Sequence, residues 1–386
     1  NVDCTNINNK YTILLTGATG FFGCHLLIEM LKNESSIKKI YCIVRSKKNN
    51  YAKDRLIRKI HFYFNHQYDD LVDKYVEVVE GEIINKHFQV NTEKYKELIK
   101  ETDIVIHSAA NVKHYGNYHN SEEANIDATR NVIDFCKEAK AHLHYISTMT
   151  ISGNYLSKQD KNDNLVFDEN TFYIGQNFED NVYSKSKLIA ETLVLNYMSN
   201  STKATVYRLG DLTGRYSDGH FQKNINDNAT YLRLKSILEI GAIPKNLRNI
   251  KLEFSPVDCV SKAVRMIIWS DKCENRIFNI YNPNLLPFLK LKEFLRKQNY
   301  TIKEISKEDF SQLIKEISSE QKNQKKLIGI INDFTDNDDL IYNYTIKQSN
   351  TITCEYLKKL GFDWITIDEE YICKLLTYMK HVNFIK

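Results

Sequence analysis

The stretch Thr16-Gly17-Ala18-Thr19-Gly20-Phe21-Phe22-Gly23 decides the fold of this chain. An apolar, partly β-branched run over 11–15 precedes it and predicts a buried strand, and apolar residues at helical spacing over 24–31 predict a helix after it. Glycines in such a turn let the backbone approach a ligand closely, while the following helix presents free N–H groups and a partial positive charge. The stretch therefore predicts a loop that binds the pyrophosphate of a dinucleotide.

The glycine spacing in this loop is GxxGxxG rather than the commoner GxGxxG. This variant resembles the short-chain dehydrogenase/reductase superfamily. The alternative interpretation is an ordinary glycine-rich turn between a strand and a helix. We expect the loop to contact the cofactor through Thr16, Gly17, Thr19, Gly20, Phe21, Phe22 and Gly23.

A basic residue ends the second predicted strand, over 39–44, where many NAD-binding folds carry an acidic one. That residue is Arg45, and Lys47, Lys48 and Arg55 follow it. A cationic side chain at this position suits the 2′-phosphate of NADPH, whereas a carboxylate would suit the ribose 2′-hydroxyl of NADH. We expect Arg45 and Arg55 to bind this phosphate and NADPH to be the cofactor; the alternative is a solvated basic loop.

Three further segments are expected to line the cofactor site. The loop that closes the third strand is placed to cover the adenine, and the small residues after strand 103–107 let a cofactor lie against the backbone. The helix over about 121–139 follows them. The cofactor contacts expected from these segments are Glu82, Ile83, Ser108, Ala109, Ala110 and Asn125.

Strands and helices alternate along the first half of the chain, which is typical of a doubly wound parallel sheet. The sequence thus predicts an α/β, Rossmann-type domain over 1–213 that takes back a segment at about 250–282. Residues 214–249 and 283–386 are expected to form a smaller, mainly helical domain. The polar stretch 152–182 is long for a loop and predicts a functional segment such as a lid.

Tyr183 and Lys187 lie four residues apart on a predicted helix and therefore share a face. An ammonium beside the phenol favours phenolate, so we expect a lowered pKa for Tyr183 and a role as proton donor. Thr148, at the end of a predicted central strand, offers a hydroxyl to a substrate carbonyl oxygen, which gives an oxyanion site. Lys187 is also expected to bind the nicotinamide ribose, with Tyr183 beside it. The alternative is an exposed helix face.

Four segments carry a family resemblance, at 107–112, 145–148, 183–191 and 207–215. They resemble the thioester reductase domains at the C-terminal end of nonribosomal peptide synthetases, aminoadipate reductases and carboxylic acid reductases. The stretch 214–222 and the tail, with Leu360-Gly361-Phe362-Asp363-Trp364, are similar to the peptide-synthetase members in particular. Glu82 departs from the pattern, since the family more often has Asp there. The resemblance covers almost the whole chain, about residues 11–384.

This resemblance implies a reaction. A peptidyl or aminoacyl thioester arrives on the phosphopantetheine arm of a peptidyl carrier domain, and NADPH reduces it to an aldehyde, with an alcohol as the product of a second reduction. Thr148 and Tyr183 would stabilise and protonate the developing oxygen charge. The segments 152–182 and 214–226 and the C-terminal helices would form the substrate channel and the carrier dock.

The composition bears on whether the protein binds nucleic acid, binds metal or spans a membrane. The net charge is +4, from 53 basic and 49 acidic residues, which does not indicate nucleic-acid binding. The 8 cysteines show no metal-binding spacing and predict free thiols in a reducing cytoplasm, with no metal. No apolar run predicts a membrane span. The chain begins at Asn1 rather than Met, so we expect a piece cut from a longer protein, monomeric when excised.

Three alternatives share parts of this pattern. An extended epimerase or dehydratase of nucleotide-sugars has the same loop and YxxxK, but Arg45 and the stretch 214–222 argue against it. A fatty acyl-CoA reductase would need an apolar channel and, often, a membrane-associating tail. A non-catalytic NADP-binding regulator would tend to lose Tyr183 or Lys187, and both are present.

Overall fold

The computed structural model describes residues 10–46, 51–110, 118–154, 165–178, 181–200, 202–319, 327 and 346–386. For residues 118–124 it describes the backbone alone. Lys47, Lys48 and parts of the predicted functional segment, at 155–164 and 179–180, lie outside the described residues.

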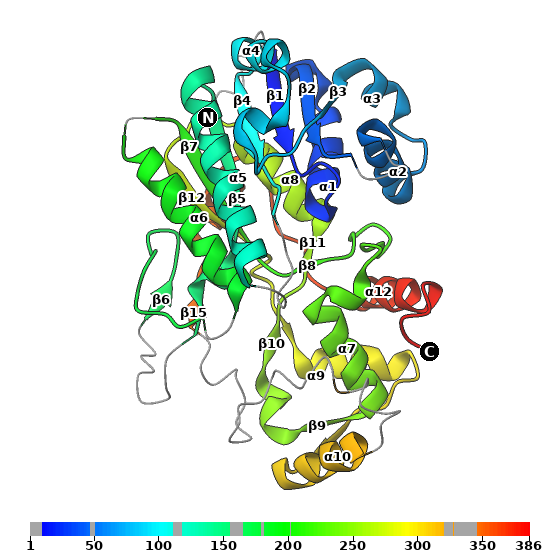
Figure 1. Cartoon of the computed structure of the whole chain (residues 1–386). Helices are drawn as coiled ribbons and strands as arrows, with labels where there is room; N and C mark the ends of the chain where they lie inside the picture. The colour runs from blue at the N-terminus through cyan, green and yellow to red at the C-terminus, as the bar shows by residue number, and fades with distance from the viewer. Residues whose placement is uncertain are drawn as a thin grey trace.

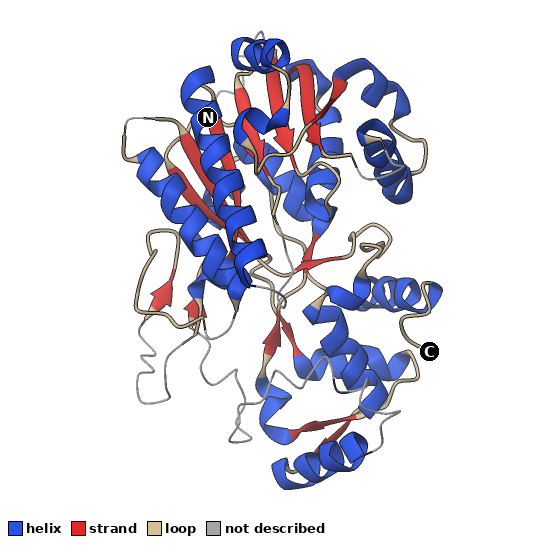
Figure 2. Cartoon of the chain, viewed as in Figure 1, coloured by secondary structure: helices blue, strands red, loops and turns tan. Residues whose placement is uncertain are grey.

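A seven-stranded sheet forms the centre of the molecule (Figures 1 and 2), in the order β12-β7-β5-β4-β1-β2-β3. Every neighbouring pair is parallel. The chain builds outward from β1 to β3 and then crosses to β4 on the other side of β1, which is the doubly wound arrangement predicted from the sequence. The α/β fold class is confirmed. The strands are β1 (Tyr11–Thr16), β2 (Ile37–Val44), β3 (Val76–Glu80), β4 (Ile104–His107), β5 (His142–Thr148), β7 (Ala204–Leu209) and β12 (Arg276–Ile280).

Alternate residues of each strand enter two different cores. In β1, Ile13 and Leu15 belong to one hydrophobic cluster and Leu14 to another, because successive strand side chains point to opposite faces. The cluster around Leu14 includes α4 (Thr92–Glu101), α5 (Tyr118–Ala139) and α6 (Val182–Met198). The cluster around Ile13 includes α1 (Phe21–Leu31), α2 (Ala52–Phe64), α3 (Asp69–Tyr75), α8 (Val257–Ile268) and α11 (Thr351–Lys359).

A separate hydrophobic cluster holds the smaller, lower part of the molecule in Figure 1 together. Helices α7 (Ala229–Ile240), α9 (Phe288–Lys297) and α12 (Glu369–His381) supply most of it, with α10 (Lys307–Ser319) beside them. Two-stranded pairs join β14 (Lys303–Ile305) to β9 (Ala242–Pro244), β10 (Lys251–Leu252) to β13 (Leu286–Pro287), β11 (Ser255–Pro256) to β8 (Leu212–Thr213), and β15 (Lys347–Gln348) to β6 (Val166–Phe167). Short 3₁₀ helices cover Glu34–Ser36 (η1), Lys86–Gln89 (η2), Met149–Ser152 (η3), Ile225–Asp227 (η4) and Lys245–Asn249 (η5).

The C-terminal part returns to the sheet at its β12 edge. Asn279 of β12 donates its backbone N–H to Thr353 Oγ1 at 2.9 Å and its side-chain amide to the Ser349 carbonyl oxygen at 2.8 Å. Leu357 of α11 and Phe362 lie in the same cluster as the sheet residues. Residues 349–362, which are predicted from the sequence to belong to the smaller domain, therefore pack against the Rossmann sheet. The domain boundaries themselves stay a prediction.

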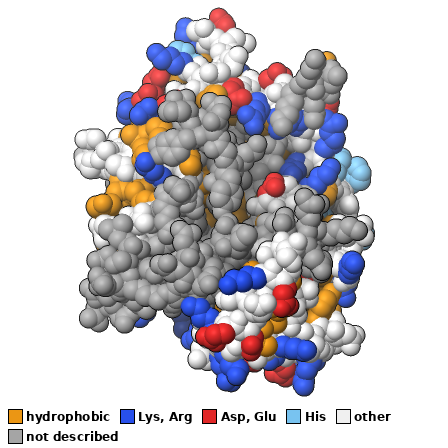
Figure 3. All heavy atoms as spheres, turned by 60° about the horizontal axis from the view of Figure 1, so that its bottom comes forward, with side chains coloured by type: hydrophobic (Ala, Val, Ile, Leu, Met, Phe, Trp, Pro, Cys, Tyr) orange, Lys and Arg blue, Asp and Glu red, His pale blue; other side chains and the backbone are white. Residues whose placement is uncertain are grey.

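The described surface carries both signs of charge. On the face shown in Figure 3, Lys and Arg side chains are interspersed with Asp and Glu rather than gathered into one basic field. Within the part of the chain that the structure describes, no helix has the length and apolar character that crossing a membrane requires.

Candidate active site

Close backbone packing shapes the turn between β1 and α1. Gly17 has φ +81°, and a Cβ there would lie 2.6 Å from the backbone of Ser108 and Ala109 at the end of β4. A Cβ on Gly23 would lie 2.2 Å from the Gly17 carbonyl oxygen, and Gly20 donates its N–H to that oxygen at 2.8 Å. The three glycines therefore let the turn, the first helix and the neighbouring strand end meet at backbone contact.

The N-terminus of α1 fits a phosphate-binding role. Helix α1 begins at Phe21, with Gly20 as an exposed N-cap that has no side-chain capping hydrogen bond. Thr19 is half-buried beside it, and Phe22 packs into the sheet core. The N–H groups of the first helical turn have no partners within the helix, so they can bind a pyrophosphate.

A series of buried hydrogen bonds connects the residue before this glycine turn to β4 and α5. Thr16 Oγ1 lies 2.7 Å from His107 Nδ1 and accepts from the Ala109 N–H at 3.3 Å. His107 Nε2 lies 3.3 Å from Thr129 Oγ1, which itself donates to the Asn125 carbonyl oxygen at 2.8 Å. Burial lowers the pKa of His107 to about 3, so the ring is neutral. One consistent assignment has Nε2–H donating to Thr129 and Thr16 donating to Nδ1.

The predicted phosphate-binding residues gather where β2 ends. Arg55 of α2 donates to the Arg45 carbonyl oxygen. Arg45 pairs with Glu82 across 3.6 Å, and its side chain remains 60% exposed. The Ile83 carbonyl oxygen accepts from the Asn131 side chain at 2.9 Å, which fixes the loop after β3 against α5. Three predicted cofactor residues, Arg45, Glu82 and Ile83, thus follow neighbouring strands of the sheet, and Arg55 reaches the first of them from α2.

The proposed catalytic side chains meet where β5 ends beside α6. A hydrogen bond links the Thr148 hydroxyl to the Tyr183 phenol. Lys187 is buried, donates to the Ile146 carbonyl oxygen at 2.7 Å, and places Nζ 4.4 Å from the centre of the Tyr145 ring. The face of α6 that carries Lys187 is therefore buried rather than exposed. A phenol and an amine from this helix lie near the Thr148 hydroxyl at the end of β5.

The pKa values depart from the sequence expectation. Burial raises the pKa of Tyr183 to about 12, although the Thr148 hydrogen bond opposes this rise. The expected lowering by Lys187 does not occur: burial of the phenol raises its pKa, and the amine donates its hydrogen bond to the Ile146 carbonyl oxygen. Burial also lowers the pKa of Lys187 to about 7, while Glu191 acts in the opposite direction. Tyr183 is thus a protonated phenol at neutral pH, the form that can donate a proton.

A second buried link ties this helix to the cofactor side. The Asn125 side chain donates to Ser186 Oγ at 3.0 Å, and Ser186 donates to the Tyr183 carbonyl oxygen at 2.9 Å. Asn125 therefore bridges α5 and α6, and its carbonyl oxygen accepts from Thr129.

Sequence reasoning missed several polar residues of this region. Ser186 and Glu191 lie on the same buried face of α6 as Lys187. Their helical spacing from Lys187 was the sequence signal that could have identified them. His107 gave a weaker signal, as a polar residue that ends an apolar strand. Missed residues with buried contacts are His107, Thr129, Asn131, Ser147, Ser186, Glu191 and Arg208.

Among the residues that the structure describes, two groups of possible metal ligands arise from the fold. Each brings its ligand atoms within 4.8 Å of one another, and neither includes a predicted site residue. The groups are His142, His144 and Cys273, and His61, His66 and Asp69.

Comparisons with solved structures agree with this geometry. A thiolation-reductase di-domain from an archaeal non-ribosomal peptide synthetase is 30% identical, with a TM-score of 0.82 over 99% of this chain and 79% of that one. The terminal R domain of the myxalamid PKS-NRPS pathway is 23% identical and has the same fold, with a TM-score of 0.83 over 98% of this chain and 93% of that one. The predicted resemblance to peptide-synthetase reductase domains is confirmed.

Curated relatives are much longer than this chain. Glycine betaine reductase ATRR of Emericella nidulans is 26% identical over 79% of this chain and 24% of its own length. A linear gramicidin synthase protein of Brevibacillus parabrevis is 22% identical over 95% of this chain, which spans 7% of that protein. A family model described as male sterility protein, an NAD-binding family, matches residues 15–264. The chain therefore belongs to this NAD-binding family and has a site for a nicotinamide cofactor.

Proposed function

We propose that the chain is a reductase domain that releases a peptidyl or aminoacyl group from a carrier-bound thioester as an aldehyde. The observation that carries the proposal is the meeting of Thr148, Tyr183 and Lys187 at the end of β5, on the same edge of the parallel sheet as the glycine turn. The 30% identity to a thiolation-reductase di-domain supports a carrier domain as the partner, since that protein joins the two functions in one chain.

The residues of the cofactor site fit NADPH. The glycine turn leaves no room for a Cβ at Gly17, and the uncapped start of α1 offers its N–H groups to the pyrophosphate. Arg45 and Arg55 supply positive charge where a 2′-phosphate would lie, and Arg45 is exposed enough to reach it. When bound, NADPH supplies the hydride that reduces the thioester carbonyl carbon.

Thr148 and Tyr183 act on the carbonyl oxygen. Both can donate hydrogen bonds as negative charge develops there, which stabilises the tetrahedral transition state. The Tyr183 phenol, with its raised pKa, then donates its proton to that oxygen, and the Lys187 ammonium stabilises the resulting phenolate. The hemithioacetal hydroxyl then returns its proton to the Tyr183 phenolate as the C–S bond breaks, which gives the aldehyde and expels a thiolate that takes a proton from water. Because the thiol has a pKa of about 8.5, the thiolate is a tolerable leaving group and no cysteine nucleophile is needed. A second round would give an alcohol.

The nucleotide-sugar alternative is not favoured. The di-domain compared above includes a peptide-synthetase reductase, and the charge at Arg45 favours a phosphorylated cofactor. A non-catalytic regulator would tend to lose Tyr183 or Lys187, whereas this chain has both.

The deciding experiment mixes the purified chain with NADPH and a carrier domain loaded with an acyl-phosphopantetheine thioester. We expect loss of NADPH absorbance and release of an aldehyde or alcohol, identified by mass spectrometry. A carrier loaded with the same acyl group through an amide in place of the thioester is the matched control. Consumption of a nucleotide-sugar with no thioester reduction would overturn the proposal.

A further inference from the structure

We propose that Glu191 and Arg208 are positioning residues, which hold the strand end bearing Thr148, the helix bearing Lys187 and the segment 165–178 in one arrangement. The inference rests on the proposed function, because it concerns the same site. Neither residue touches the predicted reacting atoms, so both would act through others.

The pair is fully buried and closely bonded. Arg208 donates to Glu191 Oε1 from Nε at 2.9 Å and from Nη2 at 2.7 Å, and both side chains are 0% exposed. Arg208 lies on β7 and Glu191 on α6, so the pair fastens the helix to the sheet. A buried pair adds little stability over apolar residues of the same size, so stability alone does not account for it.

The second oxygen of Glu191 reaches the catalytic strand. Glu191 Oε2 accepts from Ser147 Oγ at 2.5 Å, and Ser147 is the residue before Thr148. Lys187 lies one turn earlier on α6 and donates to the carbonyl oxygen of Ile146, the residue before Ser147. The helix and the strand are therefore joined by two hydrogen bonds at adjacent positions, next to the hydroxyl that faces Tyr183.

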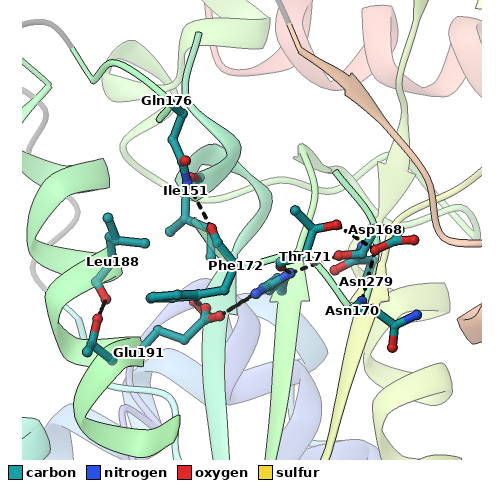
Figure 4. A network of polar contacts seen from close by, with 12 residues as sticks. Ile151, Asp168, Asn170, Thr171, Phe172, Gln176, Leu188, Glu191 and Asn279 are labelled. Atoms are coloured by element: carbon teal, nitrogen blue, oxygen red, sulfur yellow. Dashed lines mark hydrogen bonds and ion pairs between the residues drawn. The ribbon is translucent and has the colours of Figure 1, made fainter. Parts of the chain in front are cut away.

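The remaining guanidinium nitrogen of Arg208 reaches another segment. Arg208 Nη1 donates to the carbonyl oxygens of Thr171, at 2.9 Å, and Asp168, at 3.2 Å, and its guanidinium lies 4.8 Å from the Phe167 ring centre. Figure 4 shows Glu191 on one side of this contact and the backbone of Asp168 and Thr171 on the other. Backbone carbonyls bonded to a buried cation stay fixed, because breaking these bonds would leave the charge without partners.

The segment 165–178 in turn packs on the residues that follow Thr148. Gln176 donates to the Ile151 carbonyl oxygen at 3.1 Å and to that of Phe172 at 2.9 Å (Figure 4). Asn154 and Asn177 exchange two backbone hydrogen bonds at 2.8 Å. Movement of this segment would therefore shift the chain just after Thr148.

Glu191 also sets the charge around Lys187. The titratable groups around this amine are Tyr183 and Glu191 on α6, Tyr145 on β5 and His107 on β4. His107 is neutral, and Tyr183 and Tyr145 keep their protons at neutral pH, so Glu191 is the anion that favours the ammonium form. Removing its charge should make Lys187 easier to deprotonate.

The test compares Glu191→Gln, Glu191→Asp and Ser147→Ala with the matched control Glu274→Gln, an exposed carboxylate paired with Lys203. Lys187 is titrated by NMR on lysine carrying ¹³C at Cε, with Lys187→Arg used to assign its signal. We expect Glu191→Gln to lower the pKa of Lys187 by about one unit, and Glu191→Asp to keep it near the wild-type value. Glu274→Gln should leave it unchanged.

Turnover gives the second readout. Glu191→Asp keeps the charge but is one methylene shorter, so it should lose the Ser147 or the Arg208 bond and reduce kcat by about tenfold or more. Ser147→Ala removes one hydroxyl, should fold normally, and should lower kcat about threefold to tenfold with unchanged NADPH affinity. If Glu191→Gln fails to fold, these two variants still decide the positioning role.

The outcomes separate the two proposals. A wild-type chain that reduces no thioester overturns the proposed function, while a lowered Lys187 pKa in Glu191→Gln would still support the positioning role. Normal kcat in Ser147→Ala and Glu191→Asp, or an unmoved Lys187 titration in a folded Glu191→Gln, would overturn the positioning role.

Discussion

Lys187 donates a hydrogen bond from Nζ to the carbonyl oxygen of Ile146 across 2.7 Å. This bond joins the middle of α6 to β5 two residues before Thr148. It holds the amine beside the strand end while leaving the Tyr183 phenol bonded to Thr148. The catalytic proposal therefore depends on an amine that is anchored, buried and still able to change its charge.

The first prediction concerns pH. The reaction needs the Lys187 ammonium, and this form predominates below its pKa of about 7 in the cofactor-free chain. We expect kcat/KM for thioester reduction to fall as the pH rises through about 7, since this parameter reports the free enzyme. The guanidinium of Lys187→Arg stays charged at alkaline pH, so this variant should lose most activity and its remaining activity should not fall as the pH rises through about 7. A wild-type profile that stays level through neutral pH into the alkaline range would contradict the assignment.

The second prediction concerns the proton donor. Tyr183→Phe removes the hydroxyl that bonds Thr148 and donates the proton, and it should reduce kcat by a factor of about 10² to 10⁴. The unfolding temperature should stay close to wild type, because the ring is retained. Tyr173→Phe is the matched control, since Tyr173 is 68% exposed and outside the proposed catalytic set. Near-normal kcat in Tyr183→Phe would remove Tyr183 from the mechanism.

The third prediction concerns cofactor choice. Arg45→Ala should weaken NADPH binding by about tenfold to a hundredfold and NADH binding far less, because the guanidinium would contact only the 2′-phosphate. Fluorescence titration of both cofactors measures the two Kd values. Arg130→Ala, which changes an exposed arginine paired with Asp127, is the control. Equal losses for the two cofactors would show that Arg45 does not recognise the phosphate.

The fourth prediction separates backbone strain from close packing. Gly17 and Gly175 have similar positive φ angles, +81° and +76°, but a Cβ at Gly175 would meet no atom within 4 Å. Alanine at either position should lower the free energy of unfolding by about 1–2 kcal/mol through the backbone alone. Gly17→Ala should cost clearly more and abolish NADPH binding, since its Cβ would press on Ser108 and Ala109. Urea unfolding of both variants compares the two effects, and equal losses would rule out the contact with β4.

Periodicity predicted the regular elements of the fold well. The strand predicted over 39–44 lies within β2, and the helix predicted over about 121–139 lies within α5, because apolar periodicity marks both. Helix α3 was not predicted from the sequence. This helix has seven residues with few apolar ones, too few to show a helical period.

The candidate site was predictable only where residues lie near one another in the chain. Tyr183 and Lys187 are four positions apart, so helical geometry alone brings them together. Glu191 and Arg208 are 17 positions apart, and no role was predicted for either residue, because their contact arises only when α6 packs on β7. The Tyr183 pKa also escaped prediction, since burial depends on the packing of strands and helices from the whole chain.

The covering of β12 by residues 349–353 has a consequence for how the molecule can be shortened. β12 is the outermost strand of the sheet, and Asn279 directs its backbone N–H to Thr353 instead of to another strand. A chain trimmed before residue 346 would leave this edge bare, ready to pair with the same edge of a second copy. We therefore expect a chain that ends before residue 346 to associate with itself more readily than the full chain.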